Sequence, residues 1–268
     1  MSQVKPGFTK KIVWNKSKLF YQVETLIFGE AFKRALNPER IILGVDNSLK
    51  KINSEVRKFY KKFKCPIIKT DFNTAEIIKI SINVYLISSI TTTNLLAKIV
   101  KKMKGNWIDL ENALRLDKRI GKYAYLKPGL GISGGNLERD LYNISDISRK
   151  NKISNKLFEF WKESSINQKA WAYTIYKSDL QKRKDTKLGV LGLAYKANTN
   201  SLKNSPGIEL IKKIKKNKIY IFDPIVKKIR KQNNVIISKN NKEVIARSNI
   251  LFVMTPWNEF KNININTI

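Results

Sequence analysis

The chain has 268 residues, of which 42% are hydrophobic, and its formal net charge is +32. This length and hydrophobic content indicate a folded protein of one or two domains and exclude a disordered chain. The 53 Lys and Arg residues are spread along the whole sequence, which indicates a solvated basic surface that holds anions loosely. Because no zinc-ligand spacing or helix-turn-helix pattern is present, we expect no specific nucleic-acid partner and no metal site.

We expect the protein to be cytoplasmic. Residues 1–20 are mixed and basic and lack the apolar core of a signal peptide. The single cysteine, Cys65, excludes a disulfide within the chain and is interpreted as a buried strand residue. The uncharged stretch Ile80–Ala97 is long enough to cross a membrane, but Ser, Thr and Asn fill much of it. These polar groups are costly in lipid, so we expect no membrane partner.

In chain order, residues 1–70 alternate short apolar runs with basic segments. Arg40–Asp46 is predicted to be a strand, because an apolar run follows the turn signal Asn37-Pro38. Asn53–Phe63 has helical spacing, and Cys65–Lys69 is predicted to be a second strand.

Residues 71–183 are predicted to be helical. Asn73 or Thr74 is expected to cap a long helix, with Glu76 in its first turn. Apolar residues recur at helical spacing from Ile77 to Val100.

A second helical stretch, Ser154–Leu180, ends in the charged linker Gln181–Lys187. Strands and a helix then alternate. The predicted strands are 188–193, 218–222, 235–238 and 250–255, with a helix over 206–216. This alternation predicts a parallel, doubly wound sheet and therefore an α/β fold.

Two glycine patterns bear on ligand binding. Gly129, Gly131 and Gly134 satisfy the spacing GxGxxG, but residues 118–128 before them do not have the pattern of a buried strand. We therefore predict no dinucleotide site there. The loop is either flexible or a backbone that lies against a ligand, since glycine permits close approach.

The second pattern combines Gly189, Gly192 and Ala194 with a predicted strand, and Asp223 ends the next predicted strand. This arrangement is Rossmann-like, with a nucleotide expected at the carboxyl ends of the strands. The third glycine of the fingerprint is absent, so the pattern predicts only a nucleotide-sized crevice.

Several motifs, in one order along the chain, resemble the UDP-glucose/GDP-mannose dehydrogenase family. They are SQVKPGFT at 2–9, ETLIFGEA at 24–31 followed by NPER at 37–40, TAEIIKISIN at 74–83, LDKRIG at 116–121, PGLGISGGNLERD at 128–140, GLAYKANTNSLKNSP at 192–206 and TPWNEF at 255–260. Each motif alone is weak, but the ordered set is specific.

The resemblance implies three domains. Residues 1–70 resemble the end of an N-terminal NAD-binding Rossmann domain, with SQVKPGFT as its late strand and turn. Residues 71–183 resemble the central domain, whose long helix forms the dimer and carries catalytic residues, and 184–268 the C-terminal Rossmann-like domain for the nucleotide sugar. The NAD fingerprint is not found, so no residue here is assigned to NAD. Either the chain is truncated or a separate NAD-domain chain supplies that half.

The resemblance also implies a catalytic set. Lys79 and Asn83 match the helix positions that hold the reacting oxygen and a water, and their spacing puts them on one helix face. A lysine there stabilises a developing alkoxide. Glu24 and Asp140 match acidic residues that assist proton movement, although each fits an ordinary surface carboxylate as well.

Departures from the family pattern surround this site. The nucleophilic cysteine is replaced by Asn136, and a carboxamide cannot form a thiohemiacetal. The positions of a glutamate, a threonine and a lysine hold Phe28, Gln3 and Arg139. We therefore expect at most one two-electron oxidation.

Matches to substrate-binding positions are better preserved. The glycines of the fifth motif are expected to surround the sugar, and basic residues to contact the diphosphate. These residues are Gly129, Gly131, Gly134, Gly135, Lys196 and Lys203, together with Arg119, which reaches the substrate of the neighbouring subunit. The leading hypothesis is an NAD-dependent nucleotide-sugar dehydrogenase, with this chain inactive alone. The alternative is a non-catalytic nucleotide-sugar-binding or dimerisation fragment.

Overall fold

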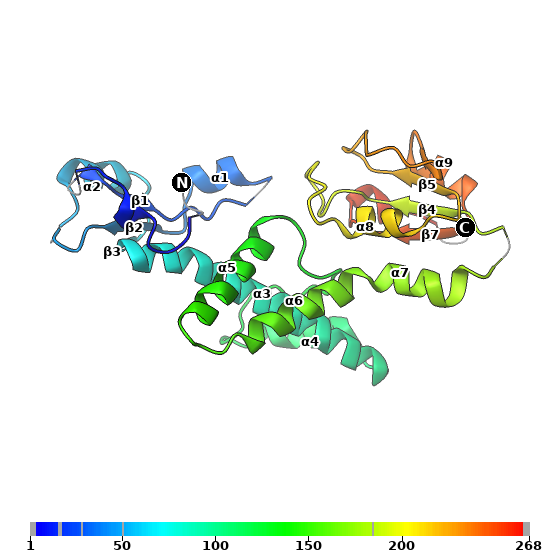
Figure 1. The fold of residues 1–268 in the computed structure, drawn as a ribbon, viewed down its shortest axis with the longest axis horizontal. Coiled ribbons are helices and arrows are strands. Elements are labelled where there is room, and N and C mark those ends of the chain that lie inside the picture. Colours follow the sequence, from blue (N-terminus) through cyan, green and yellow to red (C-terminus); the bar gives the residue numbers. More distant parts are fainter. Residues whose placement is uncertain (1–3, 16–17, 28, 50, 184, 265–268) are drawn as a thin grey trace. The chain divides into compact units, whose positions relative to one another are not determined.

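A computed structural model describes residues 4–15, 18–27, 29–49, 51–183 and 185–264 (Figure 1). The chain forms two compact units, Met1–Tyr85 and Leu86–Ile268. The boundary lies inside one long helix, α3 (Phe72–Lys102). The three-domain division predicted at residues 70 and 183 stays a prediction.

The first unit is built on a three-stranded sheet in the order β1-β2-β3. β1 (Tyr21–Gln22) pairs antiparallel with β2 (Ile41–Val45), which pairs parallel with β3 (Ile67–Asp71). All five residues of β2 are buried, as its apolar run predicts. The connecting helices are η1 (Thr9–Lys11), α1 (Ala31–Leu36) and α2 (Ser54–Lys61).

One prediction for this unit is wrong. Cys65 is half-buried and lies before β3, because Pro66 has no N–H to donate and the ladder begins at Ile67. Residues 6–8 of the first motif form the expected turn, which leads into η1, and the strand expected before it stays a prediction. Positions 1–3 of that motif, which include Gln3, lie outside the described residues, as does Phe28.

The long helix α3 begins earlier than predicted. The Asp71 carboxylate accepts the Thr74 backbone N–H at 3.1 Å, so Asp71 provides the cap in place of Asn73 or Thr74. Glu76 is fully buried and accepts the backbone N–H groups of Gly7 and Thr9, at 2.5 and 2.8 Å. Glu76 therefore fastens the N-terminal segment and does not face solvent in the first turn.

α3 buries polar as well as apolar side chains, and it exposes several apolar ones. Lys79, Asn83 and Asn94 are buried, as are Ile80 and Ile87, whereas Tyr85 and Ile99 are 78% and 49% exposed. By length and composition α3 could cross a membrane. The polar groups on its buried side are hydrogen-bonded in part to the protein, since Asn94 accepts the Gly129 backbone N–H at 2.8 Å.

The second unit contains the rest of the helices. After α3 come α4 (Trp107–Leu116), α5 (Asn136–Lys150), α6 (Lys156–Lys169) and α7 (Trp171–Ile175), which continues as a π-helical turn to Leu180. The predicted helix over 154–180 is thus confirmed, with a break at Ala170 between α6 and α7.

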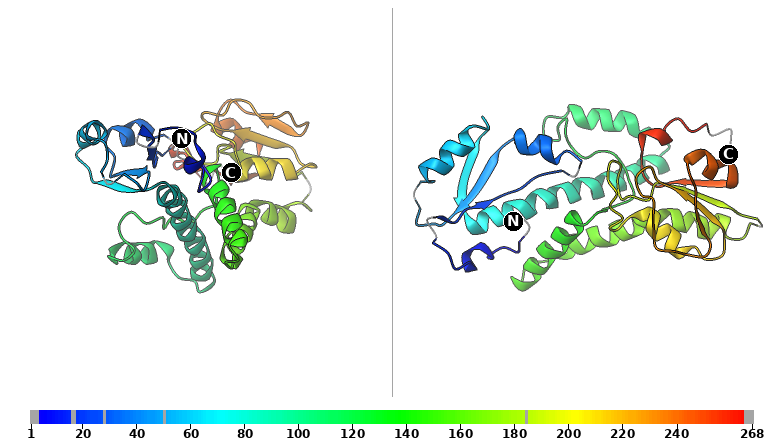
Figure 2. Two further views of the ribbon diagram at one scale, coloured as in Figure 1. Left: turned by 60° about the vertical axis from the view of Figure 1, so that its left-hand side comes forward. Right: turned by 90° about the horizontal axis from the view of Figure 1, so that it is seen from above.

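The C-terminal sheet has the order β6-β5-β4-β7, and every neighbouring pair is parallel. Its strands are β4 (Leu188–Leu191), β5 (Ile219–Phe222), β6 (Val235–Ile237) and β7 (Ile250–Val253), and its helices are α8 (Pro206–Lys213) and α9 (Asn241–Arg247). The crossovers through α8 and α9 run in opposite directions along the sheet. Right-handed connections therefore place these helices on opposite faces (Figure 2). The predicted doubly wound sheet is confirmed.

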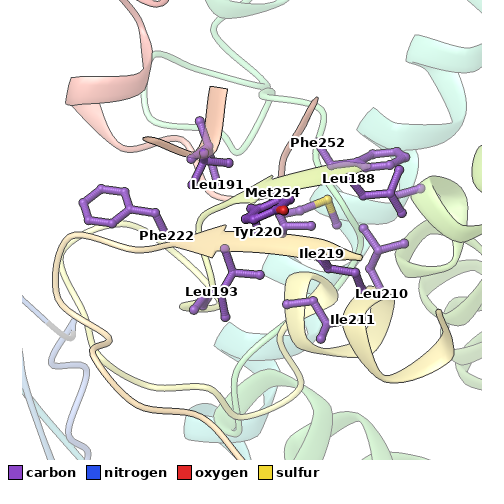
Figure 3. Packing of buried hydrophobic residues seen from close by; sticks show 14 of the residues in the cluster. Leu188, Leu191, Leu193, Leu210, Ile211, Ile219, Tyr220, Phe222, Phe252 and Met254 are labelled. Carbon is purple, nitrogen blue, oxygen red and sulfur yellow. The ribbon is translucent and has the colours of Figure 1, made fainter. Parts of the chain in front are cut away.

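The largest hydrophobic core lies in this sheet (Figure 3). β4 and β5 are buried along their whole length, and Leu210 and Ile211 of α8 pack against them. Ser205 caps α8 by accepting the Ile208 N–H, and Pro206 occupies the first turn.

Candidate functional site

The glycine loop, which we define as residues 128–135, precedes α5 and is held by side chains of two helices. Gly129 donates its N–H to Asn94 of α3, and its carbonyl accepts from Gln168 of α6 at 2.9 Å. Ile132 donates its N–H to the Ser165 hydroxyl at 2.8 Å. No strand precedes the loop in the described residues from 117 onward, as the sequence pattern predicts.

The glycines of this loop differ in what lies beside them. Gly131 and Gly134 have φ of +80° and +84°. A Cβ on Gly131 would lie 2.8 Å from the Ser165 carbonyl oxygen, and one on Gly134 would lie 2.8 Å from the Tyr195 ring. Protein atoms therefore occupy the space beside these two glycines. Gly129 is exposed and its missing Cβ faces open space, so its backbone remains accessible to a ligand.

A second loop, residues 195–204, packs directly on the first, and we call it the lysine loop. Gly134 donates its N–H to the Lys203 carbonyl at 3.2 Å, and Asn204 donates its side-chain amide to the Gly134 carbonyl at 2.9 Å. A Cβ on Gly135 would lie 2.9 Å from Lys203 Cδ. The structure therefore brings together Gly134, Gly135 and Lys203, residues predicted separately from the sequence.

A polar cluster stabilises the junction between the glycine loop and the lysine loop. The Glu138 carboxylate in α5 accepts hydrogen bonds from Lys169 of α6 and from Asn204 of the lysine loop. Lys169 is buried, so its charge requires this partner. The sequence alone does not predict a role for these three residues. A buried lysine in α6 cannot be recognised from spacing alone, because burial depends on the packing of α5 against α6.

The two predicted lysines present their charges differently. Lys203 is exposed, and its side chain lies over Gly135. Lys196 is half-buried, with its ammonium 5.9 Å from the centre of the Tyr195 ring. Burial raises the pKa of Tyr195, which keeps this phenol neutral beside the two cations.

The turn after β4, at Gly192, is occupied by contacts with other protein atoms. Gly192 has φ of +92°, and a Cβ there would lie 2.5 Å from Thr255 Cβ. The N–H groups of Leu193 and Ala194, which would face a phosphate in a Rossmann turn, both donate to Asp223 Oδ2 at 2.7 and 3.1 Å. This turn therefore has no free N–H pair for a pyrophosphate.

The Asp223 carboxylate stabilises that turn through several hydrogen bonds. Its Oδ1 accepts the N–H groups of Ile225 and Val226, and its Oδ2 also accepts Trp257 Nε1–H at 3.2 Å. Burial alone raises the pKa of Asp223, but the backbone hydrogen bonds from Val226, Leu193, Ala194 and Ile225 outweigh it and hold the pKa below its usual value. The carboxylate is thus a structural anion.

The predicted catalytic residues fall in both units. In the first unit, Lys79 and Asn83 are both buried on one face of α3. Glu24 is half-buried beside β1, where it accepts from Gln22 Nε2 at 3.1 Å. Burial, and then the Glu24 charge, raise the pKa of Tyr60.

In the second unit, Asn136 is the first residue of α5 and is exposed at the end of the glycine loop. Asp140, one turn later, is buried and forms an ion pair with Arg139, with 3.2 Å between Oδ1 and Nε. Arg119 lies outside this group: its side chain is 89% exposed and pairs with Asp117, whose carboxylate raises the pKa of Arg119.

Two domain descriptions from one family match the sequence. The central domain of the UDP-glucose/GDP-mannose dehydrogenase family matches residues 73–168, and the UDP binding domain of that family matches residues 189–268. The chain belongs to the UDP-glucose/GDP-mannose dehydrogenase family. The central-domain match contains the glycine loop, and the UDP-binding match contains the lysine loop.

Individual relatives agree with this assignment. The chain is 31% identical to a UDP-glucose 6-dehydrogenase of Rickettsia felis over 90% of this chain and 55% of that protein. It is 31% identical to the UDP-glucose 6-dehydrogenase of Rickettsia prowazekii over 98% of this chain and 64% of that protein. The chain thus spans less than two thirds of the length of these relatives.

Solved structures of family members have the same fold. A UDP-glucose dehydrogenase from Pyrobaculum islandicum superimposes with a TM-score of 0.81 at 21% identity, over 91% of this chain and 57% of the other. A UDP-D-ManNAc dehydrogenase from Pyrococcus horikoshii gives 0.77 at 22% identity, over 98% of this chain and 63% of the other. The predicted architecture is confirmed: the end of a Rossmann domain, a long central helix and a C-terminal Rossmann-like domain.

Proposed function

We propose that the chain is the substrate-binding part of an NAD-dependent nucleotide-sugar dehydrogenase of the UDP-glucose 6-dehydrogenase type, which oxidises a sugar CH–OH. One observation carries the proposal. The glycine loop and the lysine loop, which lie far apart in the sequence, are hydrogen-bonded to each other at Gly134, Lys203 and Asn204.

This junction has the chemistry that a nucleotide sugar needs. Gly129 leaves open space into which a sugar can fit, and Lys196 and Lys203 offer two ammonium groups to a diphosphate. A lysine contributes a point charge without the planar fork of an arginine. The nucleotide therefore gains affinity from charge more than from directional hydrogen bonds, and we expect its binding to weaken with salt.

The described residues do not fit a dinucleotide. The two N–H groups of the β4 turn are occupied by Asp223, and the glycine loop follows no strand. When NAD is bound it accepts the hydride, and we propose that it is held outside the described residues or by a separate chain.

The reaction assigned to this chain is limited by Asn136. In our proposal the Lys79 ammonium stabilises the developing alkoxide, Asn83 holds a water beside it, and Asp140 or Glu24 assists proton movement. Asn136 occupies the position of the family's nucleophile and cannot hold the aldehyde covalently for a second oxidation.

Stoichiometry tests this chemistry. Supplied with an NAD domain, the chain should produce at most one NADH per sugar and no uronic acid, and Lys79→Ala should abolish turnover. Two NADH per sugar with an acid product by mass spectrometry would contradict the role of Asn136, and unchanged turnover in Lys79→Ala would contradict that of Lys79.

Binding tests the substrate assignment. By calorimetry at moderate salt, the chain should bind UDP-glucose more tightly than NAD. The double variant Lys196→Gln/Lys203→Gln should weaken UDP-glucose binding by at least about tenfold. Lys215→Gln/Lys216→Gln removes two exposed charges after α8 and is the matched control. Tighter binding of NAD, or equal weakening in the control, would refute the assignment.

We also propose that the chain forms a homodimer through α3. Leu95, Ile99 and Met103 are spaced by four residues and are 47%, 49% and 77% exposed, so they form an apolar stripe that a partner surface would cover. Light scattering at micromolar concentration should show a dimer, and Leu95→Asp/Ile99→Asp should show a monomer. A monomeric wild-type chain would refute this proposal.

A further inference from the structure

A cavity of about 300 Å³ opens at the carboxyl ends of β4, β5 and β6. Phe222, the last residue of β5, points away from Leu210 and Ile211 of α8 (Figure 3). With Val226 and Ile229 it gives the cavity an apolar wall. In the part of the chain that the structure describes, its lining contains neither Lys196 nor Lys203. The cavity is therefore separate from the proposed nucleotide-sugar site.

Three ammonium groups surround this cavity. Lys227, Lys228 and Lys239 line it and are otherwise exposed. Lys227 Nζ lies 5.5 Å from the centre of the Phe222 ring. Among the described residues that line the cavity, Asp223 alone carries a carboxylate, and its oxygens are already bonded to four backbone N–H groups and an indole. The three lysines therefore leave the lining with a net positive charge.

A buried hydroxyl completes the lining. Ser238 follows β6 and is 5% exposed, and its hydroxyl oxygen has no hydrogen-bond partner within residues 4–15, 18–27, 29–49, 51–183 and 185–264. A buried hydroxyl without a partner is unfavourable. This atom is satisfied when a polar group of a ligand enters the cavity.

These features define the chemistry of the ligand. An apolar wall suits the ring of a base, and the lysines suit a phosphate. The volume is at the small end of the ligand pockets found in proteins, which run from about 300 to 1,000 Å³. A dinucleotide is excluded because Asp223 occupies the N–H groups that its pyrophosphate would need.

We propose that this cavity binds a nucleoside phosphate, with the base against Phe222, the phosphate among Lys227, Lys228 and Lys239, and the Ser238 hydroxyl bonded to the sugar or phosphate. The site is independent of the proposed dehydrogenase chemistry. It gives the C-terminal domain a second nucleotide site beside the one for the nucleotide sugar.

The test uses the whole chain and AMP as the probe, with inorganic phosphate and adenosine as the two halves of the ligand. Calorimetry at moderate salt should show AMP binding at least tenfold tighter than either half. Lys227→Gln/Lys239→Gln should weaken AMP binding at least tenfold, and Ser238→Ala should weaken it severalfold. Lys215→Gln/Lys216→Gln, which removes the same charge elsewhere, should leave it unchanged.

Competition and fold controls make the outcome decisive. UDP-glucose should not displace AMP, and thermal melting should show that all variants remain folded. The proposal is overturned if AMP does not bind at millimolar concentration, if inorganic phosphate binds as tightly as AMP, if both double variants weaken AMP equally, or if UDP-glucose competes with AMP.

Discussion

The glycine loop and the β4 turn both carry glycines at Rossmann-like spacing, yet their surroundings differ. At the β4 turn the backbone N–H groups of Leu193 and Ala194 are consumed by Asp223, and Gly192 is pressed against Thr255. In the glycine loop Gly131 and Gly134 pack against protein, but Gly129 stays open. A glycine pattern in a sequence therefore indicates that some group lies close to the backbone. Only the surrounding structure shows whether that group belongs to the protein or to a ligand.

The largest expected effect on stability is at Gly192 in the β4 turn, where the cost of backbone strain can be separated from the cost of steric crowding. Gly192→Ala should destabilise the second unit by roughly 2–5 kcal/mol, because Ala is strained at positive φ and its Cβ meets Thr255. Gly121 has φ of +88° with open space around it. Gly121→Ala should therefore cost only about 1–2 kcal/mol. Urea unfolding of both variants measures the difference, and equal losses would mean that Gly192 is not crowded.

Asp223 gives the stability of the β4 turn a pH dependence. Its pKa in the folded state lies below the unfolded value of about 3.9. The ionised carboxylate therefore stabilises the fold above about pH 4, and this contribution is lost as pH falls through the folded-state pKa.

The variant Asp223→Asn measures that contribution. At pH 7 it should cost roughly 1–3 kcal/mol, because an amide cannot accept all of the N–H bonds. Thermal melting between pH 7 and pH 3 should show the gap between variant and wild type narrowing below about pH 4. A gap that stays constant over this range would show that ionisation of Asp223 does not stabilise the turn.

Asn204 tests whether the two loops act as one site. Asn204→Ala removes the bonds to the Gly134 carbonyl and to Glu138. It should cost about 1–2 kcal/mol of stability and should lower UDP-glucose affinity. Asn200 is exposed in the same loop, so Asn200→Ala is the control. If Asn204→Ala left UDP-glucose affinity unchanged, the junction would be structural only.

The smallest expected effect on stability is at Gly129. A methyl group there meets no atom within 4 Å, so Gly129→Ala should change the free energy of unfolding by less than about 0.5 kcal/mol. UDP-glucose affinity should fall, because the methyl group occupies the space kept for the ligand. A variant with lower stability and normal affinity would reverse this assignment.

Much of the fold could be predicted from local patterns. β2, α2 and the alternating elements from β4 to β7 follow from apolar runs and turn residues, which act over a few residues. The predictions of element boundaries were wrong where the local structure depends on neighbouring residues. The start of β3 depends on Pro66, and the cap of α3 depends on a strand that continues directly into a helix.

The site was harder to predict for the same reason. Lys203 and the glycine loop were each identified, but their contact depends on tertiary packing. Glu138 and Asn204 lie within quoted motifs and Lys169 lies outside them, but their shared cluster forms only where α5, α6 and the lysine loop meet. The sequence could not show that the Asp223 carboxylate bonds to the protein's own backbone. Asp223 stands at the end of a strand, and a carboxylate that binds a ribose has the same position in a Rossmann domain.

The central claim is that the glycine loop and the lysine loop together bind a nucleotide sugar. Amide hydrogen exchange with and without UDP-glucose tests it most directly, because each loop yields its own peptides. We predict that UDP-glucose slows exchange in both 128–136 and 195–204, and leaves 223–239 unchanged. Protection of only one loop, or protection confined to 223–239, would contradict the account.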